Sequence, residues 1–454
     1  MRIFHVSWEY PPVIYGGLGR HVLALTRAQA AAGHDVTVIT QRPADTPTAQ
    51  TLDGVCVVRT RTETPPVRRD VAGLMHWTAD LDEQLAATVS ALDCEPPEVV
   101  HVHDWVVERA ARAAGKRWPA PVVATIHATE AGRHAGWIVG DVSESVYAAE
   151  WRLARRATAV ITCSVAMAAE AIALYELAPE RVLTIPNGID LARWSAQPTV
   201  APAGTYCHEP DAPAAPTAHR PGNRQRRDDP VRDGLARPTV ATTAPTQNPT
   251  LAANPVVLFV GRLEWEKGVQ VLIEAVKLLP DEPSVDVLIA GVGTQADRFG
   301  KLAADETRVR FMGQVSDAEL RQLLSNAAVV VVPSLYEPFG IVALEAAAAG
   351  AALIVSDVGG LAEIVTSSVT GLSVPPNQPA ALAAAITAVL ADPASARLRA
   401  ARLRAQLPEI YSWDRIAERT VAVYRAARTM RRAAPVPLTA TAPQSAGQLL
   451  DCGW

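Results

Sequence analysis

Two short stretches in the C-terminal half of the chain carry the residues best suited to chemistry. They are Arg262–Gly268, which includes Lys267, and Glu337–Glu345, which begins and ends on a carboxylate. Each follows a hydrophobic run that predicts a strand, and ligands of parallel α/β sheets bind at the carboxyl ends of strands. Cations on one loop and carboxylates on the other suit a ligand with both phosphates and hydroxyls, such as a nucleotide sugar.

The first stretch is suited to binding a diphosphate. Breaking a sugar–diphosphate bond leaves negative charge on the phosphate, which preorganised donors stabilise. Arg262 offers a planar fork, Lys267 offers a compact charge, and Gly268 opens a predicted helix whose free amides add positive potential. Taken alone, the stretch supports equally well a surface network of ion pairs with Glu264 and Glu266.

The second stretch combines two carboxylates with the start of a helix. Pro338 suits a first helical turn, so Phe339 and Gly340 are expected to present unpaired amides. Glu345 lies roughly 7.5 Å beyond Gly340 along a regular helix, so one carboxylate can hold sugar hydroxyls while the other reaches a ribose. Both acids could instead be ordinary helix-start carboxylates. The apolar neighbours of Glu345, however, predict that it is buried and has a partner.

The N-terminal half offers weaker signals at similar places. Gly16 and Gly17 follow the first predicted strand and open a helix, where glycines let a backbone approach a ligand closely. Val22 breaks the dinucleotide-binding pattern Gly-x-Gly-x-x-Gly. Asn187 lies in a predicted turn at the junction of the two halves, so a role in a cleft between them stays open.

Histidine and aspartate side chains follow two apolar strands and raise the question of a metal. His101, His103 and Asp104 follow one predicted strand, and His127 follows the next. Alternation along the strand is expected to place His101 and His103 on opposite faces, which removes the simplest chelate. The Asp-Leu-Asp tripeptide at positions 80–82 lies in a helical stretch with no strand before it. The sequence therefore predicts no metal site.

The elements that position these residues form two alternating series. Short Val- and Ile-rich runs predict strands at Arg2–Ser7, Asp35–Thr40, Val55–Arg59, Val99–Val102, Val122–Ile126, Ala159–Cys163 and Val182–Ile185. After a break the rhythm restarts, with strands at Val256–Val260, Val285–Ala290, Val309–Met312, Ala328–Val332 and Ala352–Ser356. Apolar strands separated by helices imply parallel sheets covered on both faces. The predicted fold is α/β, with two Rossmann-like, doubly wound domains facing a cleft.

The predicted boundaries separate these domains from two segments of different composition. The N-terminal domain covers 1–194, the C-terminal domain covers 255–410, and a final helix at 411–430, after a bend at Leu407–Pro408, packs back toward the first domain. Residues 195–254 contain ten prolines and few branched aliphatics. That insertion and the tail 431–454 cannot bury enough apolar surface to offset chain entropy, so both are predicted to be disordered.

Composition places the chain among soluble globular proteins. Its 454 residues suggest two domains, and 49% hydrophobic with 20% charged residues is ordinary for that class. The net charge of −5 argues against a nucleic-acid partner. Five scattered cysteines indicate reduced thiols, the chain enters a strand without room for a signal peptide, and no apolar stretch reaches the ~20 residues that span a bilayer. We expect a cytoplasmic protein.

Taken together, these motifs resemble the retaining glycosyltransferases of family 4, which have the GT-B fold. The matching elements cover about residues 1–194 and 255–428, in the order Gly16-Gly17, His103-Asp104-Trp105, Thr125-Ile-His127, Pro186–Asp190, Arg262-x4-Lys267-Gly268 and Glu337-x7-Glu345. The likeness is strongest to actinobacterial glycogen-synthase-like α-1,4-glucosyltransferases, in the stretches Val6–Pro12, Thr125–His134 and Trp265–Gly268.

This resemblance implies a role for each motif. Arg262 and Lys267 would clamp the donor diphosphate, Glu337 would hold the donor hexose, and Glu345 would hold the nucleotide ribose. The remaining donor-binding positions would be Gly16, Gly17, Gly268, Phe339 and Gly340. His127 would contact the donor sugar near its reacting carbon, with Asp104 and Asn187 on the sugar and acceptor side. Retention would proceed by front-face attack, with the leaving phosphate helping to deprotonate the acceptor hydroxyl.

The predicted function is transfer of glucose from ADP- or UDP-glucose to the non-reducing end of an α-1,4-glucan, without a metal or any cofactor beyond the nucleotide sugar. Glycogen synthases of the family carry a Lys two residues before Gly-Gly, where this chain has Ile14, so the donor nucleotide stays open. Alternatives are transfer of mannose or another hexose to a small-molecule or lipid acceptor, and a sugar-nucleotide epimerase or hydrolase. An idle carbohydrate-binding protein is disfavoured by the intact motifs. The sequence predicts no integral membrane segment and leaves the oligomeric state undefined.

Overall fold

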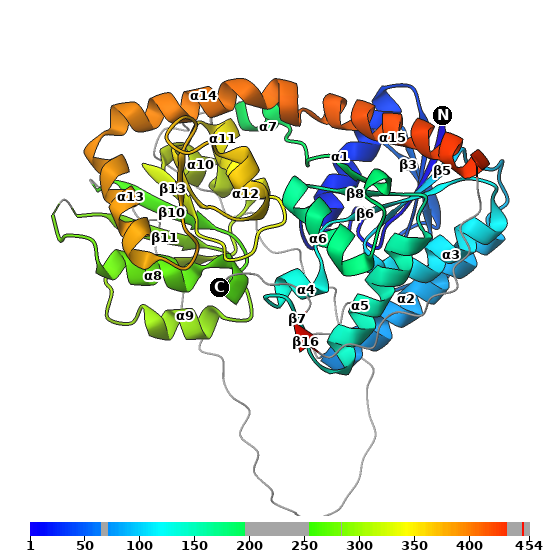
Figure 1. The fold of residues 1–454 in the computed structure, drawn as a ribbon, viewed down its shortest axis with the longest axis horizontal. Coiled ribbons are helices and arrows are strands. Elements are labelled where there is room, and N and C mark those ends of the chain that lie inside the picture. Colours follow the sequence, from blue (N-terminus) through cyan, green and yellow to red (C-terminus); the bar gives the residue numbers. More distant parts are fainter. Residues whose placement is uncertain (65–70, 196–253, 283, 434–446, 449–454) are drawn as a thin grey trace, which may run out of the picture. The chain divides into compact units, whose positions relative to one another are not determined.

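The computed structural model describes residues 1–64, 71–195, 254–282, 284–433 and 447–448. Apart from its two end residues, the predicted insertion at 195–254 lies outside these ranges. The described residues belong to one compact unit, which contains two large β-sheets with helices around them (Figure 1).

The first sheet is built from the N-terminal half of the chain. Its strand order is β3-β4-β2-β1-β5-β6-β8-β9, and every pairing is parallel except that of β3 with β4. The strands are β1 (Arg2–Val6), β2 (Asp35–Thr40), β3 (Ala49–Leu52), β4 (Val55–Arg59), β5 (Val99–His103), β6 (Val122–Ile126), β8 (Ala159–Thr162) and β9 (Val182–Thr184). The chain direction across the sheet reverses between β1 and β5, which is where ligands of such sheets bind.

The second sheet is fully parallel, in the order β12-β11-β10-β13-β14-β15. Its strands are β10 (Val256–Val260), β11 (Asp286–Ala290), β12 (Val309–Gly313), β13 (Val329–Val332), β14 (Leu353–Ser356) and β15 (Leu372–Val374). All four valines of β13 are buried, because helices cover both faces of the sheet. Here the order reverses between β10 and β13, and the two stretches with the candidate cations and carboxylates follow these two strands.

The helices of the first half are α1 (Gly17–Ala31), α2 (Val71–Ala91), α3 (Glu108–Arg117), α4 (Glu130–Arg133), α5 (Gly140–Arg156), α6 (Val165–Tyr175) and α7 (Leu191–Ser195). Those of the second half are α8 (Val269–Lys277), α9 (Ala296–Leu302), α10 (Asp317–Asn326), α11 (Ile341–Ala349), α12 (Gly359–Ile364), α13 (Pro379–Ala391), α14 (Pro393–Tyr411) and α15 (Trp413–Ala433). Short 3-10 turns occupy η1 (Trp105–Val107), η2 (Pro179–Arg181) and η3 (Trp265–Lys267).

The last helix joins the core of the first sheet. Ile416, Val421 and Tyr424 of α15 are buried in one cluster with Ile3 of β1 and Val123 of β6. In Figure 1, α14 and α15 follow one another, with α14 above α11 and α15 above α1. Helix α15 is amphipathic, and its apolar side therefore covers one face of the N-terminal sheet.

The two parallel sheets confirm the predicted α/β class. Each predicted strand agrees with the observed one to within one residue at either end. The structure adds the short strands β3, β15 and β7 (Trp137–Ile138), which lack a long apolar run. The predicted bend at Leu407–Pro408 is wrong, because α14 continues through Pro408 to Tyr411 and the chain turns at Ser412 instead.

Most of the tail 431–454, which the sequence predicts to be disordered, lies outside the described residues, and only 431–433 and 447–448 lie within them. Residues 431–433 complete α15, and β16 (Gly447–Gln448) pairs antiparallel with β7. A two-residue edge strand offers unpaired backbone groups, which explains why it can take up another strand. Among the described helices, none is by itself long and apolar enough to cross a membrane. Together α13 and α14 would pass such a test, but they are bent by 101° at the break between them.

Candidate active site

The loops that follow β10 and β13 pack backbone against backbone. Gly268 has φ +72°, and a Cβ there would lie 1.8 Å from the carbonyl oxygen of Pro333. The amide of Leu335 donates to the carbonyl of Glu266 at 2.7 Å. Only glycine tolerates both this left-handed conformation and this close approach. Gly268 therefore fixes the loop of candidate cations against the loop of candidate carboxylates.

The central contact between these loops is an ion pair of Lys267 with Glu337. Lys267 Nζ lies 2.8 Å from Glu337 Oε2, and the two side chains are only 18% and 14% exposed. The hydroxyl of Ser334 donates to the same carboxylate oxygen at 3.1 Å. Two residues that lie 70 positions apart are thus brought into direct contact. The arrangement leaves each of them able to exchange its partner for a phosphate or a sugar hydroxyl.

Arg262 behaves differently from Lys267. Its guanidinium lies 3.0 Å from Glu266, and its side chain is 61% exposed. The alternative of a surface ion pair therefore describes Arg262 in this structure. The same alternative does not describe Lys267, which pairs with Glu337. Glu264, the other expected partner, accepts a hydrogen bond from the amide of Thr294 at 2.9 Å. A phosphate would have to draw Arg262 away from Glu266, which costs little for an exposed pair.

Helix α11 begins at Ile341, so Pro338 is not in its first turn as the sequence predicts. Gly340 is its N-cap residue with φ +107°, and Ile341 is its first helical residue. Pro338 therefore precedes the helix, and its carbonyl accepts from the Ser164 hydroxyl at 2.7 Å. The ring of Phe339 is buried against Tyr411, so only its backbone can serve a ligand. No side chain caps the first turn, and the helix start is therefore a site of positive potential.

The Gly16-Gly17 loop lies beside the start of α11. A Cβ on Gly17 would be 2.9 Å from Cδ1 of Ile341, whereas a Cβ on Gly16 would point into open space. The carboxylate of Glu9, which the sequence analysis did not single out, holds this loop by accepting from the amides of Tyr15 at 2.8 Å and Gly16 at 3.1 Å. Burial raises the pKa of Glu9, and these amides oppose the shift.

Asp104 and His127 meet at the ends of β5 and β6. Asp104 Oδ1 accepts from the backbone amide of His127 at 2.7 Å. Burial raises the pKa of Asp104 to about 6 against the opposing effects of Arg133 and this amide. Burial, and then the positive charge of Arg133, lowers the pKa of His127 to about 3. His127 is therefore a neutral imidazole at neutral pH, able to accept or donate one hydrogen bond but not to act as a cation.

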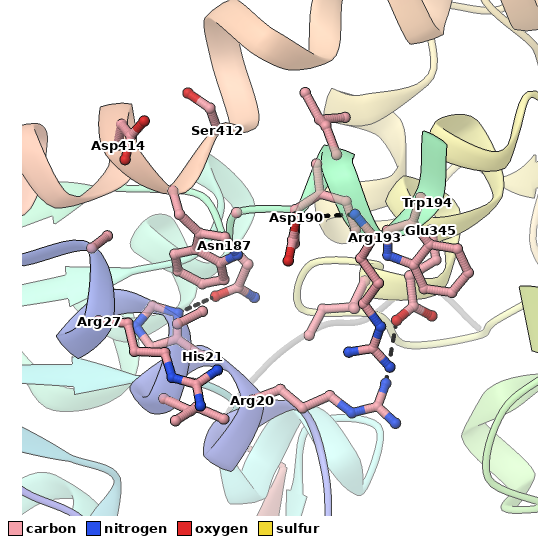
Figure 2. Close-up of a pocket in the computed structure, with 18 of the residues that line it drawn as sticks. Arg20, His21, Arg27, Asn187, Asp190, Arg193, Trp194, Glu345, Ser412 and Asp414 are labelled. Atoms are coloured by element: carbon pink, nitrogen blue, oxygen red, sulfur yellow. Dashed lines mark hydrogen bonds and ion pairs between the residues drawn. The ribbon is translucent and has the colours of Figure 1, made fainter. Parts of the chain in front are cut away.

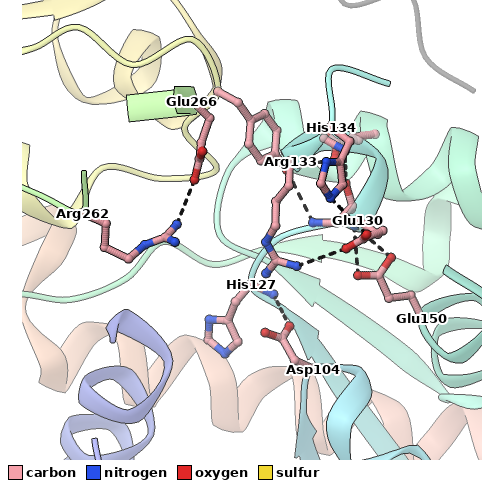
Figure 3. A network of polar contacts seen from close by, with 12 residues as sticks. Asp104, His127, Glu130, Arg133, His134, Glu150, Arg262 and Glu266 are labelled. Carbon is pink, nitrogen blue, oxygen red and sulfur yellow. Dashed lines mark hydrogen bonds and ion pairs between the residues drawn. The ribbon is translucent and has the colours of Figure 1, made fainter. Parts of the chain in front are cut away.

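A cation near Asp104 and His127 is Arg133 on α4. In the sequence it belongs to the stretch Thr125–His134, which resembles the glycosyltransferase family, but no role is predicted for it. Figure 3 shows its guanidinium between His127 and the carboxylates of Glu130 and Glu150. Glu150 accepts from the amide of Glu130 at 3.0 and 3.1 Å, and burial raises its pKa to about 8. The sequence pattern could not indicate Arg133, because a four-residue helix is too short to show a helical period of apolar residues.

Helix α4 also contacts the loop after β13, which carries the candidate carboxylate Glu337. A Cβ on Gly132 would lie 2.3 Å from the ring of Tyr336, and the Tyr336 hydroxyl donates to Glu170 at 3.0 Å. Tyr336 directly precedes Glu337. The close approach of Gly132 to Tyr336 therefore places the residues around His127 near those around Lys267.

Glu345 is buried and has a partner, as predicted. It lies 3.2 Å from Arg20 of α1, and burial raises its pKa to about 7. It lines a pocket of about 500 Å³ with Arg20, His21, Asn187 and Arg193 (Figure 2). Asn187 Oδ1 lies 2.7 Å from His21 Nδ1, so the predicted turn does reach a pocket. Arg20 and Arg193 went unmarked because arginine is common throughout this chain.

The expectation that His101 and His103 face opposite sides of β5 is wrong. Residues two apart in a strand lie on the same face, and the two ring centroids are 4.2 Å apart. The acidic tripeptide at 80–82 has a structural role, because Asp82 accepts from the amides of Arg109 at 2.7 Å and Ala110 at 3.0 Å and so caps α3. The geometric reason for excluding a metal near β5 therefore does not hold.

Each half of the chain matches a known glycosyltransferase domain. Residues 15–193 match the domain described as Glycosyltransferase Family 4, and residues 242–406 match that described as Glycosyl transferases group 1. A glycogen synthase of Mycobacterium tuberculosis is 38% identical over 95% of this chain and 96% of its own. An alpha-maltose-1-phosphate synthase of Mycolicibacterium smegmatis is 30% identical over 94% of this chain and 99% of its own.

Among solved structures, sucrose-phosphate synthase from Thermosynechococcus elongatus has a TM-score of 0.67 with this chain at 24% sequence identity. The match covers 93% of this chain and 98% of that one. At this identity the likeness speaks for the fold, and it agrees with the predicted GT-B architecture of two parallel-sheet α/β domains.

Proposed function

Because this chain belongs to the family 4 glycosyltransferases, we propose that it transfers glucose from ADP- or UDP-glucose to the non-reducing end of an α-1,4-glucan, with retention of configuration. Its relation to a mycobacterial glycogen synthase supports the choice of glucose and of a glucan. The observation that carries the proposal is the contact of Lys267 with Glu337. It brings together a cation for a phosphate and a carboxylate for a hydroxyl, the two groups that a nucleotide sugar presents side by side.

The donor lies with its diphosphate between the loop after β10 and the start of α11. Lys267 and Arg262 take phosphate oxygens, releasing Glu337 and Glu266 from their present ion pairs. Glu337 then accepts hydrogen bonds from hydroxyls of the hexose. The free amides at the start of α11 and the backbone of Gly17 beside it add donors without side chains that would crowd the diphosphate. Glu345, freed from Arg20, accepts from the ribose.

In the reaction the bond between the anomeric carbon and the diphosphate oxygen breaks, and its electron pair goes to the leaving phosphate. Lys267 and Arg262 stabilise that charge where it develops, which is the largest contribution such groups make to catalysis. The acceptor hydroxyl attacks from the same face and passes its proton to the leaving phosphate. His127 and Asp104 hold the sugar on the other side. These cations supply the role that a metal ion plays in other transferases, so we propose metal-independent catalysis.

A donor and acceptor screen tests this function. Purified protein is incubated with ADP-, UDP- or GDP-glucose or with GDP-mannose, together with glycogen or maltooligosaccharides, and the released nucleotide is measured. We expect release with ADP- or UDP-glucose that depends on the glucan. Release of nucleotide and free sugar without any acceptor would instead indicate the hydrolase or epimerase alternative, and activity only with GDP-mannose would overturn the choice of hexose.

A second candidate is transfer to a small phosphorylated sugar in place of a glucan. It is supported by the relative whose name gives alpha-maltose-1-phosphate as its product. Adding glucose 1-phosphate as an acceptor to the same screen separates the two, because only this candidate predicts a soluble disaccharide phosphate.

A further inference from the structure

Five histidines gather at the carboxyl ends of the central strands of the first sheet, and the proposed function uses only His127. His5 lies on β1, His21 on α1, and His101 and His103 on β5. Ring centroids are 4.8 Å apart for His21 and His127, 5.6 Å for His103 and His127, and 5.7 Å for His21 and His103. All except His127 are buried. Which nitrogens of these imidazoles carry protons decides which of them can bind a ligand.

The hydrogen-bond network defines the proton on His103. The amide nitrogen of Gln29 donates to the Tyr424 hydroxyl at 3.1 Å, so Gln29 Oε1 faces His5 Nε2 at 2.8 Å and must accept from it. His5 Nδ1 then accepts from His103 Nε2 at 3.1 Å. A neutral imidazole has one N–H. His103 Nδ1 therefore carries a lone pair, and it faces His127 Nε2 at 3.4 Å.

The same argument applies to His21. Its Nδ1 lies 2.7 Å from Asn187 Oδ1 (Figure 2), which can only accept, so Nδ1 is protonated and Nε2 carries the lone pair. This Nε2 is buried and has no hydrogen-bond partner in the part of the chain that the structure describes. A buried acceptor without a partner is unfavourable, and its presence beside two further imidazoles points to a ligand.

We propose that His21, His103 and His127 form a binding site for a transition-metal dication, with Zn²⁺ as the best fit. One nitrogen from each of the three residues lies within 4.8 Å of the others. Zinc is bound by imidazole nitrogens at about 2.0–2.1 Å in sites of three histidines with an open fourth position. His127 is only partly buried, so its ring can move inward and leave the fourth position toward solvent.

The outer contacts of His21 and His103 suit this role. Ligating histidines donate their second nitrogen to a fixed acceptor, and here Asn187 serves His21 while His5 serves His103. The other group of three, His5, His101 and His103, is less suitable. Both nitrogens of His101 are bonded at 2.7 Å, to Tyr424 and to Thr125, and both nitrogens of His5 are used.

Metal binding would inhibit the enzyme, a consequence that rests on the proposed function. The residue expected to contact the donor sugar, His127, would instead be held by the metal beside His21 and His103. Inhibition by zinc that is reversed by EDTA is therefore compatible with catalysis that needs no metal.

Cobalt titration of the metal-free full-length protein tests the site without any substrate, so its result does not depend on the proposed function. We expect one Co²⁺ per chain, with the visible d–d bands of a four- or five-coordinate nitrogen site, displaced by Zn²⁺. His21→Gln should weaken binding at least tenfold, and His134→Gln, which changes an exposed histidine, should not. Circular dichroism verifies folding, and if His21→Gln does not fold, His127→Gln replaces it.

Two results would overturn the proposal. One is the absence of cobalt binding in the wild-type protein. The other is binding of equal strength in the folded His21→Gln or His127→Gln variant. Binding by the exposed thiols of Cys56 and Cys94 would give that second result, together with a thiolate-to-cobalt charge-transfer band.

Discussion

Replacing Lys267 by alanine should lower kcat by ~10²–10³, because preorganised donors at a developing charge typically contribute that much. The perturbation removes one positive charge and leaves the partly buried Glu337 without its partner at 2.8 Å. In the ground state, Glu337 keeps the hydrogen bond from Ser334. In the transition state, the leaving phosphate keeps Arg262, the amides of α11 and the backbone of Gly17.

The cost in folding stability should be far smaller than the cost in rate. Exposed ion pairs contribute about 0.2–1 kcal/mol, and breaking a fully buried pair costs about 3–5 kcal/mol. Lys267 and Glu337 are 18% and 14% exposed, so we expect about 1–2 kcal/mol. A domain stable by ~5–15 kcal/mol remains almost entirely folded after such a loss. Unfolding therefore cannot account for a hundredfold slower reaction.

The assay is release of nucleotide from whichever donor the wild-type protein uses, with urea denaturation measured in parallel. Lys277→Ala is the matched control, because Lys277 pairs with Glu274 at 3.3 Å on the surface, with side chains 38% and 45% exposed. It should leave both turnover and stability nearly unchanged. Turnover of Lys267→Ala within threefold of wild type would refute the assignment of Lys267 to the diphosphate.

Three further predictions address the backbone, the pH dependence and the metal. Gly268→Ala should destabilise the fold by several kcal/mol more than Gly313→Ala in urea denaturation. Both glycines are left-handed, at φ +72° and +66°, but only at Gly268 would a Cβ meet backbone, and equal costs would contradict this reasoning. Because the folded pKa of Glu345 is raised to about 7 from 4.5, its contribution to stability is complete below pH 4.5 and is lost as pH rises through 7. Glu345→Gln should therefore show a smaller decline in urea midpoint between pH 5 and pH 8, and an unchanged decline would assign it to other groups. Turnover should persist in excess EDTA, and activity that EDTA abolishes and Mn²⁺ or Mg²⁺ restores would contradict metal-independent catalysis.

The fold could be predicted well because its strands are buried on both faces. Apolar runs such as Val256–Val260 indicate such strands because they are short, rich in β-branched residues and bounded by turn residues, here Pro255 and Gly261. The strands that escaped prediction carry little of this signal: Ala49–Leu52 has one large apolar residue in four. The course of α14 through Pro408 escaped as well, since proline usually marks a helix boundary and only tertiary packing overrides it.

The motifs of the candidate site could be predicted from the sequence, but the ion pairs between their side chains could not. That Lys267 would meet Glu337, while Arg262 would pair with Glu266, depends on how two loops pack. Glu9 and Arg133 could not be found, because their roles arise from the way irregular loops bring backbone amides and carboxylates to them. The common face of His101 and His103 was predictable from the sequence, because the two-residue period of a strand puts both on one face.

The central claim, retaining glucosyl transfer to an α-glucan, is tested most directly by the structure of the product. Maltotetraose is incubated with the preferred nucleotide-glucose, and the elongated product is isolated and its new linkage is determined by proton NMR. We predict maltopentaose with an added α-1,4-linked glucose at the non-reducing end. A β-linked product, or free glucose with no elongated product, would contradict the claim.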